Sequence, residues 1–348
     1  MAAKKYKHKL VLFDAHAILH RAYHALPDFS SSKGEPTGGL YGLASMLLKI
    51  IADLRPDYMA ACYDLAEPTF RKKVYDEYKA GRAKADDELV AQMNRSRDIF
   101  TAFGVPIYDQ SGFEADDIIG TIVEKTKNKP NLEVVIASGD MDTMQLVLGD
   151  KVVVYTLKRG LNDTILYDEP AVKERFGFEP ERLPDFKGLS GDPSDNIIGV
   201  KGIGAKTATL LIQAFGSIED IYREFKKGAK GEKRFVQANI KPRLVELLKE
   251  NEEEALFSKT LATIRRDAPI DFVLPVATWK ESFDFAGIER LFGELEFKTL
   301  LARARTVLGG PPAPALAGAG EVDQALVKKA GLALWLLESE KTTPDLED

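Results

Sequence analysis

The chain has 348 residues, 45% hydrophobic and 29% charged, which is ordinary for a globular protein of about two domains, and its net charge of −6 taken alone argues against a nucleic-acid partner. Its single cysteine, Cys62, excludes an intramolecular disulfide framework and suits a reducing compartment. No signal-peptide pattern follows MAAKKYKHKL, and Lys49 and Asp53 interrupt the longest apolar stretch, so we expect a cytoplasmic protein without a membrane partner.

Three short apolar runs predict buried strands, namely KLVLF (9–13), YMAACY (58–63) and EVVIAS (133–138). They lack polar alternation, as do strands of a parallel sheet that is covered on both faces. Helical patterns lie between them at 40–54, 87–103 and 116–127. This alternation predicts an α/β fold, with a mostly parallel twisted sheet flanked by helices.

After residue 180 the pattern changes to helical runs, at 207–215, 242–257 and 288–297. We therefore expect an α/β core over 1–180 and a helical subdomain over 181–305. Residues 306–321 are rich in Gly, Pro and Ala and predict a linker. The last piece, 322–348, holds one amphipathic helix and is too small for a core of its own.

Acidic residues follow each predicted strand. Asp14 comes directly after the first, Asp64 after the second, and Asp140 closely after the third. Ligands of open parallel sheets bind beyond the carboxyl ends of the strands, so these three acids can converge although they are far apart in sequence. A single one of them could equally be a turn-forming aspartate.

Four acidic clusters stand out in all. Oxygen-rich sets of this kind suit hard cations such as Mg²⁺ or Mn²⁺, and no Cys/His spacing favours zinc. A helix-capping role for the second cluster and an Asx turn for the fourth are the plainer alternatives. The candidate metal ligands are Asp14 and Asp64; Glu114, Asp116 and Asp117; Asp140 and Asp142; and Asp192 and Asp195.

Residues 199–208 read GVKGIGAKTA and predict a phosphate-binding hairpin. Gly202 and Gly204 let backbone N–H groups approach a phosphate, the following helix adds its positive N-terminus, and Lys201 and Lys206 add charge. The string as a whole fits a sequence-independent clamp on a DNA backbone, whereas a Walker loop is excluded because GxxxxGK[ST] is not satisfied.

Residues 69–84 read TFRKKVYDEYKAGRAK, a basic segment with two tyrosines. On a helical wheel one stripe about 100° wide predicts a surface for single-stranded DNA, with tyrosines stacking on bases and cations following phosphates. An exposed helix whose tyrosines pack on the core is the alternative. The stripe consists of Arg71, Tyr75, Tyr78, Lys79 and Arg82.

Together these segments resemble the 5′-nuclease domain of bacterial DNA polymerase I, a member of the flap endonuclease family. The resemblance covers roughly 8–305. It is carried, in chain order, by FDAHAILHRAYHALP, TFRKKVYDEYKAGR, GFEADDIIGT, SGDMDTMQL, LSGDPSDNIIGVKGIGAKTA and LFGELEFKTLL. Ala15 and His16 stand where the family usually has Gly and a small polar residue, and Ile198 replaces a usual proline. The end of the chain, within 322–348, looks like the start of the next polymerase I domain.

The resemblance implies a PIN-like nuclease core, a helical arch near 69–100 and a helix-hairpin-helix at 199–215 that often binds K⁺. It implies two or more divalent ions held by the nine acids, with Lys79 and Arg82 matching the basic arch residues near the scissile phosphate. The expected activity is two-metal-ion hydrolysis of DNA at a 5′ flap, nick or 5′ end in replication or repair.

RNA primers are a further possible substrate, a separate DNA polymerase a possible partner, and a monomer is expected. Two other functions stay open: a non-catalytic module that binds DNA structures, and a Mg²⁺ phosphatase, since Asp140-Met-Asp-Thr superficially resembles an Asp-x-Asp-x-Thr motif.

Overall fold

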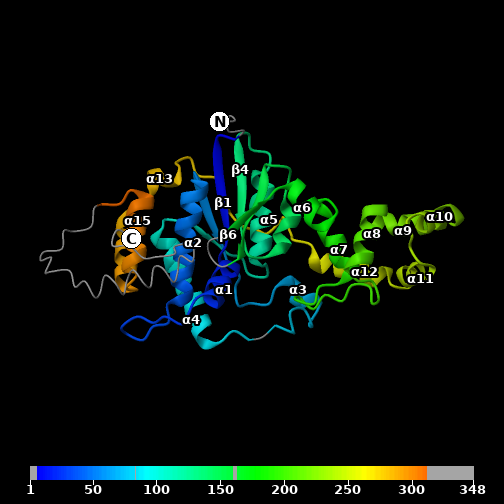
Figure 1. Ribbon diagram of the computed structural model, residues 1–348, viewed down its shortest axis with the longest axis horizontal. Coiled ribbons are helices and arrows are strands. Elements are labelled where there is room, and N and C mark those ends of the chain that lie inside the picture. The colour runs from blue at the N-terminus through cyan, green and yellow to red at the C-terminus, as the bar shows by residue number, and fades with distance from the viewer. Residues whose placement is uncertain (1–5, 83, 160–162, 312–348) are drawn as a thin grey trace, which may run out of the picture. The chain divides into compact units, whose positions relative to one another are not determined.

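The computed structural model describes residues 6–82, 84–159 and 163–311, and its centre is one six-stranded sheet (Figure 1). The spatial order is β3-β2-β1-β4-β5-β6, and only β5 and β6 pair in antiparallel fashion. The predicted α/β fold is confirmed. The strands are β1 (His8–Asp14), β2 (Tyr58–Cys62), β3 (Ile107–Tyr108), β4 (Leu132–Ala137), β5 (Val152–Arg159) and β6 (Asp163–Tyr167).

Helices cover both faces of this sheet. Consecutive side chains of β1 point to opposite sides, and because they are apolar, both faces must be buried. Val11 and Phe13 pack among residues of α1 (Ala15–Ala25), α2 (Gly38–Leu54) and α4 (Asp87–Ala102). Leu10 and Leu12 pack on the other face, against α5 (Ala115–Thr126). The sheet is therefore buried on both sides, which explains the unbroken apolar runs of its central strands.

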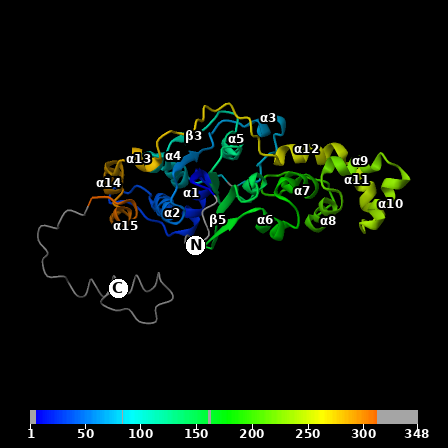
Figure 2. The ribbon, with the colours of Figure 1, turned by 90° about the horizontal axis from the view of Figure 1, so that it is seen from above.

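The remaining helices fill the second half of the chain, apart from the short α3 (Phe70–Val74) and the 3₁₀ helix η1 (Met141–Leu146). Figures 1 and 2 show α8 to α11 on the side of the sheet opposite to α15. These helices are α6 (Glu169–Phe176), η2 (Pro180–Arg182, a 3₁₀ helix), α7 (Leu183–Ser190), α8 (Ala205–Phe215), α9 (Ile218–Phe225), α10 (Ala229–Gln237), α11 (Pro242–Glu250), α12 (Glu252–Ala262), α13 (Trp279–Ser282), α14 (Phe285–Glu294) and α15 (Lys298–Leu308).

The last three helices return to the α/β core, which corrects the expected helical subdomain at 181–305. Trp279 of α13 donates a hydrogen bond from Nε1 to the carbonyl of Phe103 at 2.7 Å, and Phe292 of α14 packs against the Phe103 ring. The helical segment thus ends before α13, because the apolar faces of α13 to α15 match the surface of α2 and α4.

The described elements belong to one compact unit that ends at Gly309. Helix α15 extends to Leu308 and so occupies the start of the expected linker at 306–321. The amphipathic piece at 322–348 lies outside the described residues. None of the described helices is both long and apolar enough to cross a bilayer.

Candidate active site

A cleft of about 1130 Å³ opens at the carboxyl edge of the sheet, where β1, β2 and β4 end. A neighbouring hollow of about 560 Å³ shares Asp140 and Arg82 with it. Seven of the nine predicted acids therefore surround two adjoining spaces. Asp14, Asp64, Glu114, Asp116 and Asp140 line the cleft, and Asp140, Asp142 and Asp192 line the hollow.

Asp14 is held by the first turn of α1 and by the residue that follows β4. It caps α1 by accepting from the Ala17 N–H at 3.1 Å, and its other oxygen accepts from the Ser138 hydroxyl at 2.7 Å. Burial, together with repulsion from Asp64 and Asp140, raises the pKa of Asp14 to about 6 in spite of these hydrogen bonds. Ser138 was not predicted from the sequence, and it fixes the carboxylate at the switch point between β1 and β4.

Asp64 lies between α1 and α5. Its oxygens contact His16 Nδ1 at 3.3 Å and accept from the Ala115 N–H at 2.8 Å. Burial alone would raise the pKa of Asp64, but these two contacts outweigh it and hold that pKa below its ordinary value. His16, one of the departures from the family pattern, therefore orients a carboxylate of the cleft.

Asp116, at the start of α5, has a buried Oδ1 with no hydrogen-bond partner among the described residues. Burial and then the charges of Asp140 and Asp14 raise its pKa well above the usual range. A buried polar atom without a partner costs about 1–3 kcal/mol, and more when it is charged. Asp116, which lines the cleft beside Asp14 and Asp140, therefore has a buried oxygen whose hydrogen-bonding capacity no described residue uses.

Asp117, the next residue, lies in a different environment. It is fully buried and accepts two parallel hydrogen bonds from Arg71, both at 2.8 Å. The backbone N–H groups of Arg265 and Glu114 donate to it at 2.8 and 3.0 Å. The oxygens of Asp117 are thus satisfied within the protein, and Asp117 lines neither of the two spaces. This geometry favours a structural and helix-capping role, whereas its role as a metal ligand stays a prediction.

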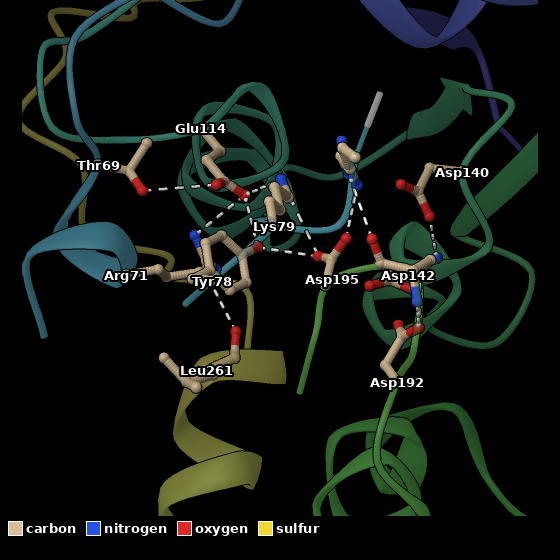
Figure 3. A network of polar contacts seen from close by, with 12 residues as sticks. Thr69, Arg71, Tyr78, Lys79, Glu114, Asp140, Asp142, Asp192, Asp195 and Leu261 are labelled. Carbon is tan, nitrogen blue, oxygen red and sulfur yellow. Dashed lines mark hydrogen bonds and ion pairs between the residues drawn. The ribbon is translucent and has the colours of Figure 1, made fainter. Parts of the chain in front are cut away.

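Two cations enter the acidic cleft from the segment after α3, and Figure 3 shows Lys79 between Glu114 and Asp195. Lys79 Nζ lies 3.0 Å from Glu114 Oε2 and 4.0 Å from Asp195 Oδ2, and Arg82 Nη2 lies 2.5 Å from Asp195 Oδ1. Burial alone would lower the pKa of Lys79, but Glu114 and Asp195 outweigh it and raise that pKa. Both predicted cations thus meet the acids.

A third cation, Lys187 at the end of α7, was not predicted. Its ammonium bridges Asp142 and Asp192 across the second hollow. Burial would lower the pKa of Lys187, but the two carboxylates raise it above its ordinary value, so the group stays charged. The sequence carries only a weak signal for this role, a lysine five residues before Asp192.

The acids do not form a closed metal cage. Among the described residues, no three His, Cys, Asp or Glu side chains are arranged to hold one ion. Lys79, Arg82 and Lys187 occupy part of the space between them. The donor set nevertheless fits a hard divalent ion, because it consists of oxygens and contains the unpartnered Asp116 Oδ1.

The predicted basic-aromatic stripe is wrong as a helix face. Helix α3 ends at Val74, and turns follow over 76–81, with Lys79 at a φ of +58°. Arg71 is 3% exposed and Tyr78 4% exposed, and Tyr78 donates to Asp195 at 2.9 Å. Tyr75 packs edge-to-face on Phe257. Neither Arg71 nor Tyr78 is open to DNA, and the expected arch near 69–100 is helical only in α3 and α4 among its described residues.

The predicted hairpin has the expected geometry between α7 and α8. Ile203 is buried, whereas Lys201, Gly202, Gly204 and Lys206 are exposed around it. Gly202 has a φ of +99°, and Gly204 is the N-cap of α8. An apolar anchor beneath an exposed loop and a helix N-terminus is a suitable surface for a phosphate.

Two family models match adjoining parts of the chain. The 5′-3′ exonuclease, N-terminal resolvase-like domain matches residues 9–177, and the 5′-3′ exonuclease, C-terminal SAM fold matches residues 178–283. DNA polymerase I of Bacillus caldotenax is 39% identical over 297 residues, which are 85% of this chain and 32% of that protein. DNA polymerase I of Chloroflexus aurantiacus is 36% identical over 345 residues, 97% of this chain and 35% of that protein.

Solved structures of bacteriophage T5 nucleases share the fold. The T5 5′-exonuclease with bound zinc has a TM-score of 0.57 at 20% identity, over 86% of this chain and 98% of that one. The T5 flap endonuclease in complex with DNA and metal ions has a TM-score of 0.58 at 19% identity, over 87% of this chain and all (100%) of that one.

Proposed function

This chain belongs to the 5′–3′ exonuclease family, and we propose that it hydrolyses phosphodiesters at the 5′ ends, nicks and 5′ flaps of branched DNA. The chain spans about a third of the length of the curated relatives it matches. The observation that carries the proposal is the acidic cleft at the carboxyl edge of the sheet, with Lys79 and Arg82 entering it. Cations would neutralise both the charge of a bound phosphate and the charge of carboxylates at this density.

We assign the divalent ions, Mg²⁺ or Mn²⁺, to the two acidic spaces. Asp14, Asp116 and Asp140 are our ligands for the first ion, because Asp116 Oδ1 has no other partner among the described residues. Asp142 and Asp192 are our ligands for a second ion, which must share or displace Lys187. When bound, such ions activate water for in-line attack and neutralise charge on the phosphoryl group. The proposed K⁺ at the hairpin rests on the family resemblance alone.

The chain's own cations have a distinct task in this proposal. Lys79 and Arg82, held by Glu114 and Asp195, would offset the negative charge that develops on the scissile phosphate. Glu114 and Asp195 then act as positioning residues for these cations. This replaces the expected direct role of those two acids as metal ligands.

We expect Lys79→Met to slow cleavage of a 5′-flap DNA by about 100-fold, while duplex affinity falls less than about tenfold. Methionine keeps an unbranched side chain of similar length and removes the ammonium charge, which in the wild-type protein lies 5.0 Å from the centroid of the Tyr78 ring. Single-turnover cleavage and fluorescence anisotropy give the two quantities. Equal losses in both would reduce Lys79 to a phosphate contact.

The hairpin is proposed to hold the duplex behind the cleaved strand. A Cβ added at Gly204 would meet no atom within 4 Å, and the φ there is −92°. We expect Gly204→Ala to cost less than about 1 kcal/mol of stability yet to weaken duplex binding roughly tenfold, because the methyl group blocks the phosphate.

Gly202→Ala is the contrasting variant for this hairpin. The φ of +99° strains any L-residue, and the added Cβ would lie 3.2 Å from Leu247 Cδ1. Thermal unfolding should therefore show a loss of stability here but not for Gly204→Ala. A sequence-selective loss of binding in Gly204→Ala would contradict a backbone clamp.

The function itself is tested by incubating the full chain with a 5′-flap DNA in Mg²⁺ and, separately, in EDTA. Cleavage near the branch that requires the metal supports the proposal. Tight binding without cleavage under either condition would favour a non-catalytic DNA-structure-binding module instead.

The same substrate with an RNA 5′ end tests our proposal that RNA primers are also removed, and sedimentation tests the proposed monomer. Pull-down tests partnership with a separate polymerase.

A further inference from the structure

One loop contacts the backbone of the segment that carries Lys79 and Arg82. Residues 192–197, which we call the clasp loop, lie between the end of α7 and the hairpin. Asp192 and Ile197 exchange two backbone hydrogen bonds, at 2.8 and 2.9 Å, and so close the clasp loop on itself. The clasp loop is therefore a compact unit and not a loose connection.

Close packing fixes the position of the clasp loop. A Cβ added at Gly199 would lie 2.1 Å from the Gly191 nitrogen, so the two flanks of the loop can approach each other only with glycine there. The Gly199 N–H donates to the Ser258 hydroxyl of α12 at 3.0 Å. The Val200 N–H donates to the Leu189 carbonyl of α7 at 2.9 Å. The loop is thus anchored to both α7 and α12.

Two consecutive residues of the clasp loop hold the backbone of residues 77–82, which we call the cation segment. The Lys79 N–H donates to the Asp195 carbonyl at 2.9 Å. The Asn196 side chain donates from Nδ2 to the Glu77 carbonyl at 2.8 Å. These contacts come from residues more than 110 positions later in the chain, so they are tertiary and not part of a local turn.

The backbone held in this way has an unfavourable conformation at Lys79. The Ala80 N–H donates to the Glu77 carbonyl at 2.9 Å, which closes a β-turn with Lys79 as its third residue. Lys79 has a φ of +58°, a left-handed conformation that residues other than glycine rarely adopt. The turn therefore needs support from outside, and the Asn196 amide binds the same carbonyl that closes it.

Asparagine suits this position of the clasp loop for two separate reasons. Asn196 itself has a φ of +57°, which asparagine tolerates better than most residues. Its amide can also donate a hydrogen bond to a carbonyl, which an ionised aspartate cannot do. Glycine would satisfy the backbone requirement but not the hydrogen bond, so a substitution can separate the two.

We propose that Asn196 is a positioning residue of the nuclease site, whose amide holds the turn that directs Lys79 to Glu114 and to the scissile phosphate. This inference rests on the proposed nuclease function. Because the clasp loop continues into the hairpin at 199–208, the same contact connects the surface proposed to hold the duplex with the cation in the cleft.

The first experiment measures hydrogen exchange of the full chain in EDTA and without DNA. Asn196→Gly removes the amide but favours the same backbone conformation, so the fold should be retained. We expect roughly fivefold faster exchange over 77–82, the effect of losing one ordinary hydrogen bond, and unchanged exchange in β1 and β4. Unchanged exchange over 77–82 would overturn the proposal.

The second experiment measures single-turnover cleavage of a 5′-flap DNA in Mg²⁺. Asn196→Gly should cleave about tenfold more slowly, while duplex affinity in EDTA changes by less than about twofold. In a Lys79→Met background the same substitution should slow cleavage by less than about threefold, because the amide acts through an ammonium that is then absent. A full tenfold effect in that background would overturn the proposed action through Lys79.

Asn131→Gly is the matched control for this substitution. Asn131 has a φ of +58° and directly precedes β4, at the edge of the sheet opposite to the cleft. The control should change neither exchange over 77–82 nor the cleavage rate. Asn196→Asp keeps the shape of the side chain and removes its donor, and it serves as the second variant if Asn196→Gly does not fold.

The possible failures of these experiments are distinguishable. Wild-type cleavage rates in the Asn196 variants would overturn the positioning role. Absence of Mg²⁺-dependent flap cleavage by the wild-type protein would instead overturn the nuclease function, on which the exchange measurement does not depend.

Discussion

Asp117→Asn is expected to lower the free energy of unfolding by about 3 kcal/mol or more. Removing one partner of a buried ion pair leaves the other charge uncompensated in a medium that solvates it poorly, which typically costs 3–5 kcal/mol. Arg71 would keep a single carboxylate partner, Glu114, whose Oε2 lies 3.4 Å from Nη1. The asparagine NH₂ would in addition face N–H donors that now point at a carboxylate oxygen.

Arg71 explains why this loss should spread beyond one helix. Its Nε and Nη2 also donate to the carbonyls of Leu261 and Thr263 at 2.8 and 2.9 Å. The ion pair thus joins α3 and α5 to the end of α12. Loosening it should disturb the placement of the whole segment that carries Lys79 and Arg82.

Thermal and urea unfolding in EDTA measure the effect, which corresponds to a Tm lower by about 6 °C or more. Asp267→Asn removes the carboxylate of an exposed pair with Arg265 and should change stability by less than about 1 kcal/mol. A stable Asp117→Asn protein that has lost its response to Mg²⁺ would restore Asp117 as a metal ligand.

The identities of the acids were predictable from sequence, but their separate tasks were not. Asp116 and Asp117 are adjacent members of one cluster, yet one faces the cleft and the other meets an arginine 46 residues earlier in the chain. Which way each carboxylate points depends on where α5 begins and on what packs against it. The local sequence around α5 does not predict where Arg71 lies relative to this helix.

The helical-wheel prediction for 69–84 failed for a related reason. It assumed one continuous helix, but the chain turns after Val74 and Lys79 adopts a left-handed conformation. The Lys79 N–H donates to the Asp195 carbonyl at 2.9 Å, a tertiary contact that competes with helical hydrogen bonding. Charge and aromatic content were recognised correctly; the backbone that distributes them was not.

Some strands were predictable from their own sequences, whereas others depend on the strands that they pair with. The central strands β1, β2 and β4 are buried on both faces and were recognisable as apolar runs. Strand β5 begins with VVVY and carried the same signal, although it was not predicted. Strand β3 has two residues and β6 is an antiparallel strand at the sheet edge, so their pairing is set by neighbours rather than by their own sequences.

Asp116→Asn is expected to raise the free energy of unfolding, whereas Asp117→Asn lowers it. In the metal-free protein, Asp116 is a buried carboxylate with an unpartnered oxygen, facing Asp14 and Asp140. Asparagine removes the charge while keeping the shape, and its amide can donate to the neighbouring carboxylates. We expect a gain of about 1–2 kcal/mol in EDTA.

The same substitution should remove function. Without the Asp116 charge, the cleft loses the oxygen that we assign to the first ion, and flap cleavage should fall by about 100-fold or more. The increase in Tm that Mg²⁺ or Mn²⁺ gives the wild-type protein by binding its folded state should also largely vanish.

Tm values of both proteins, in EDTA and across a Mn²⁺ titration, separate the possible causes. A higher Tm in EDTA together with a lost response to Mn²⁺ would identify Asp116 as a residue kept for metal binding at the expense of stability. A lower Tm in EDTA would mean that Asp116 has a structural partner after all, and a full Mn²⁺ response would place the ion elsewhere. Because Asp116 and Asp117 are sequence neighbours on one helix turn, opposite signs in EDTA cannot arise from helix propensity or net charge, and must reflect the cleft and the buried arginine.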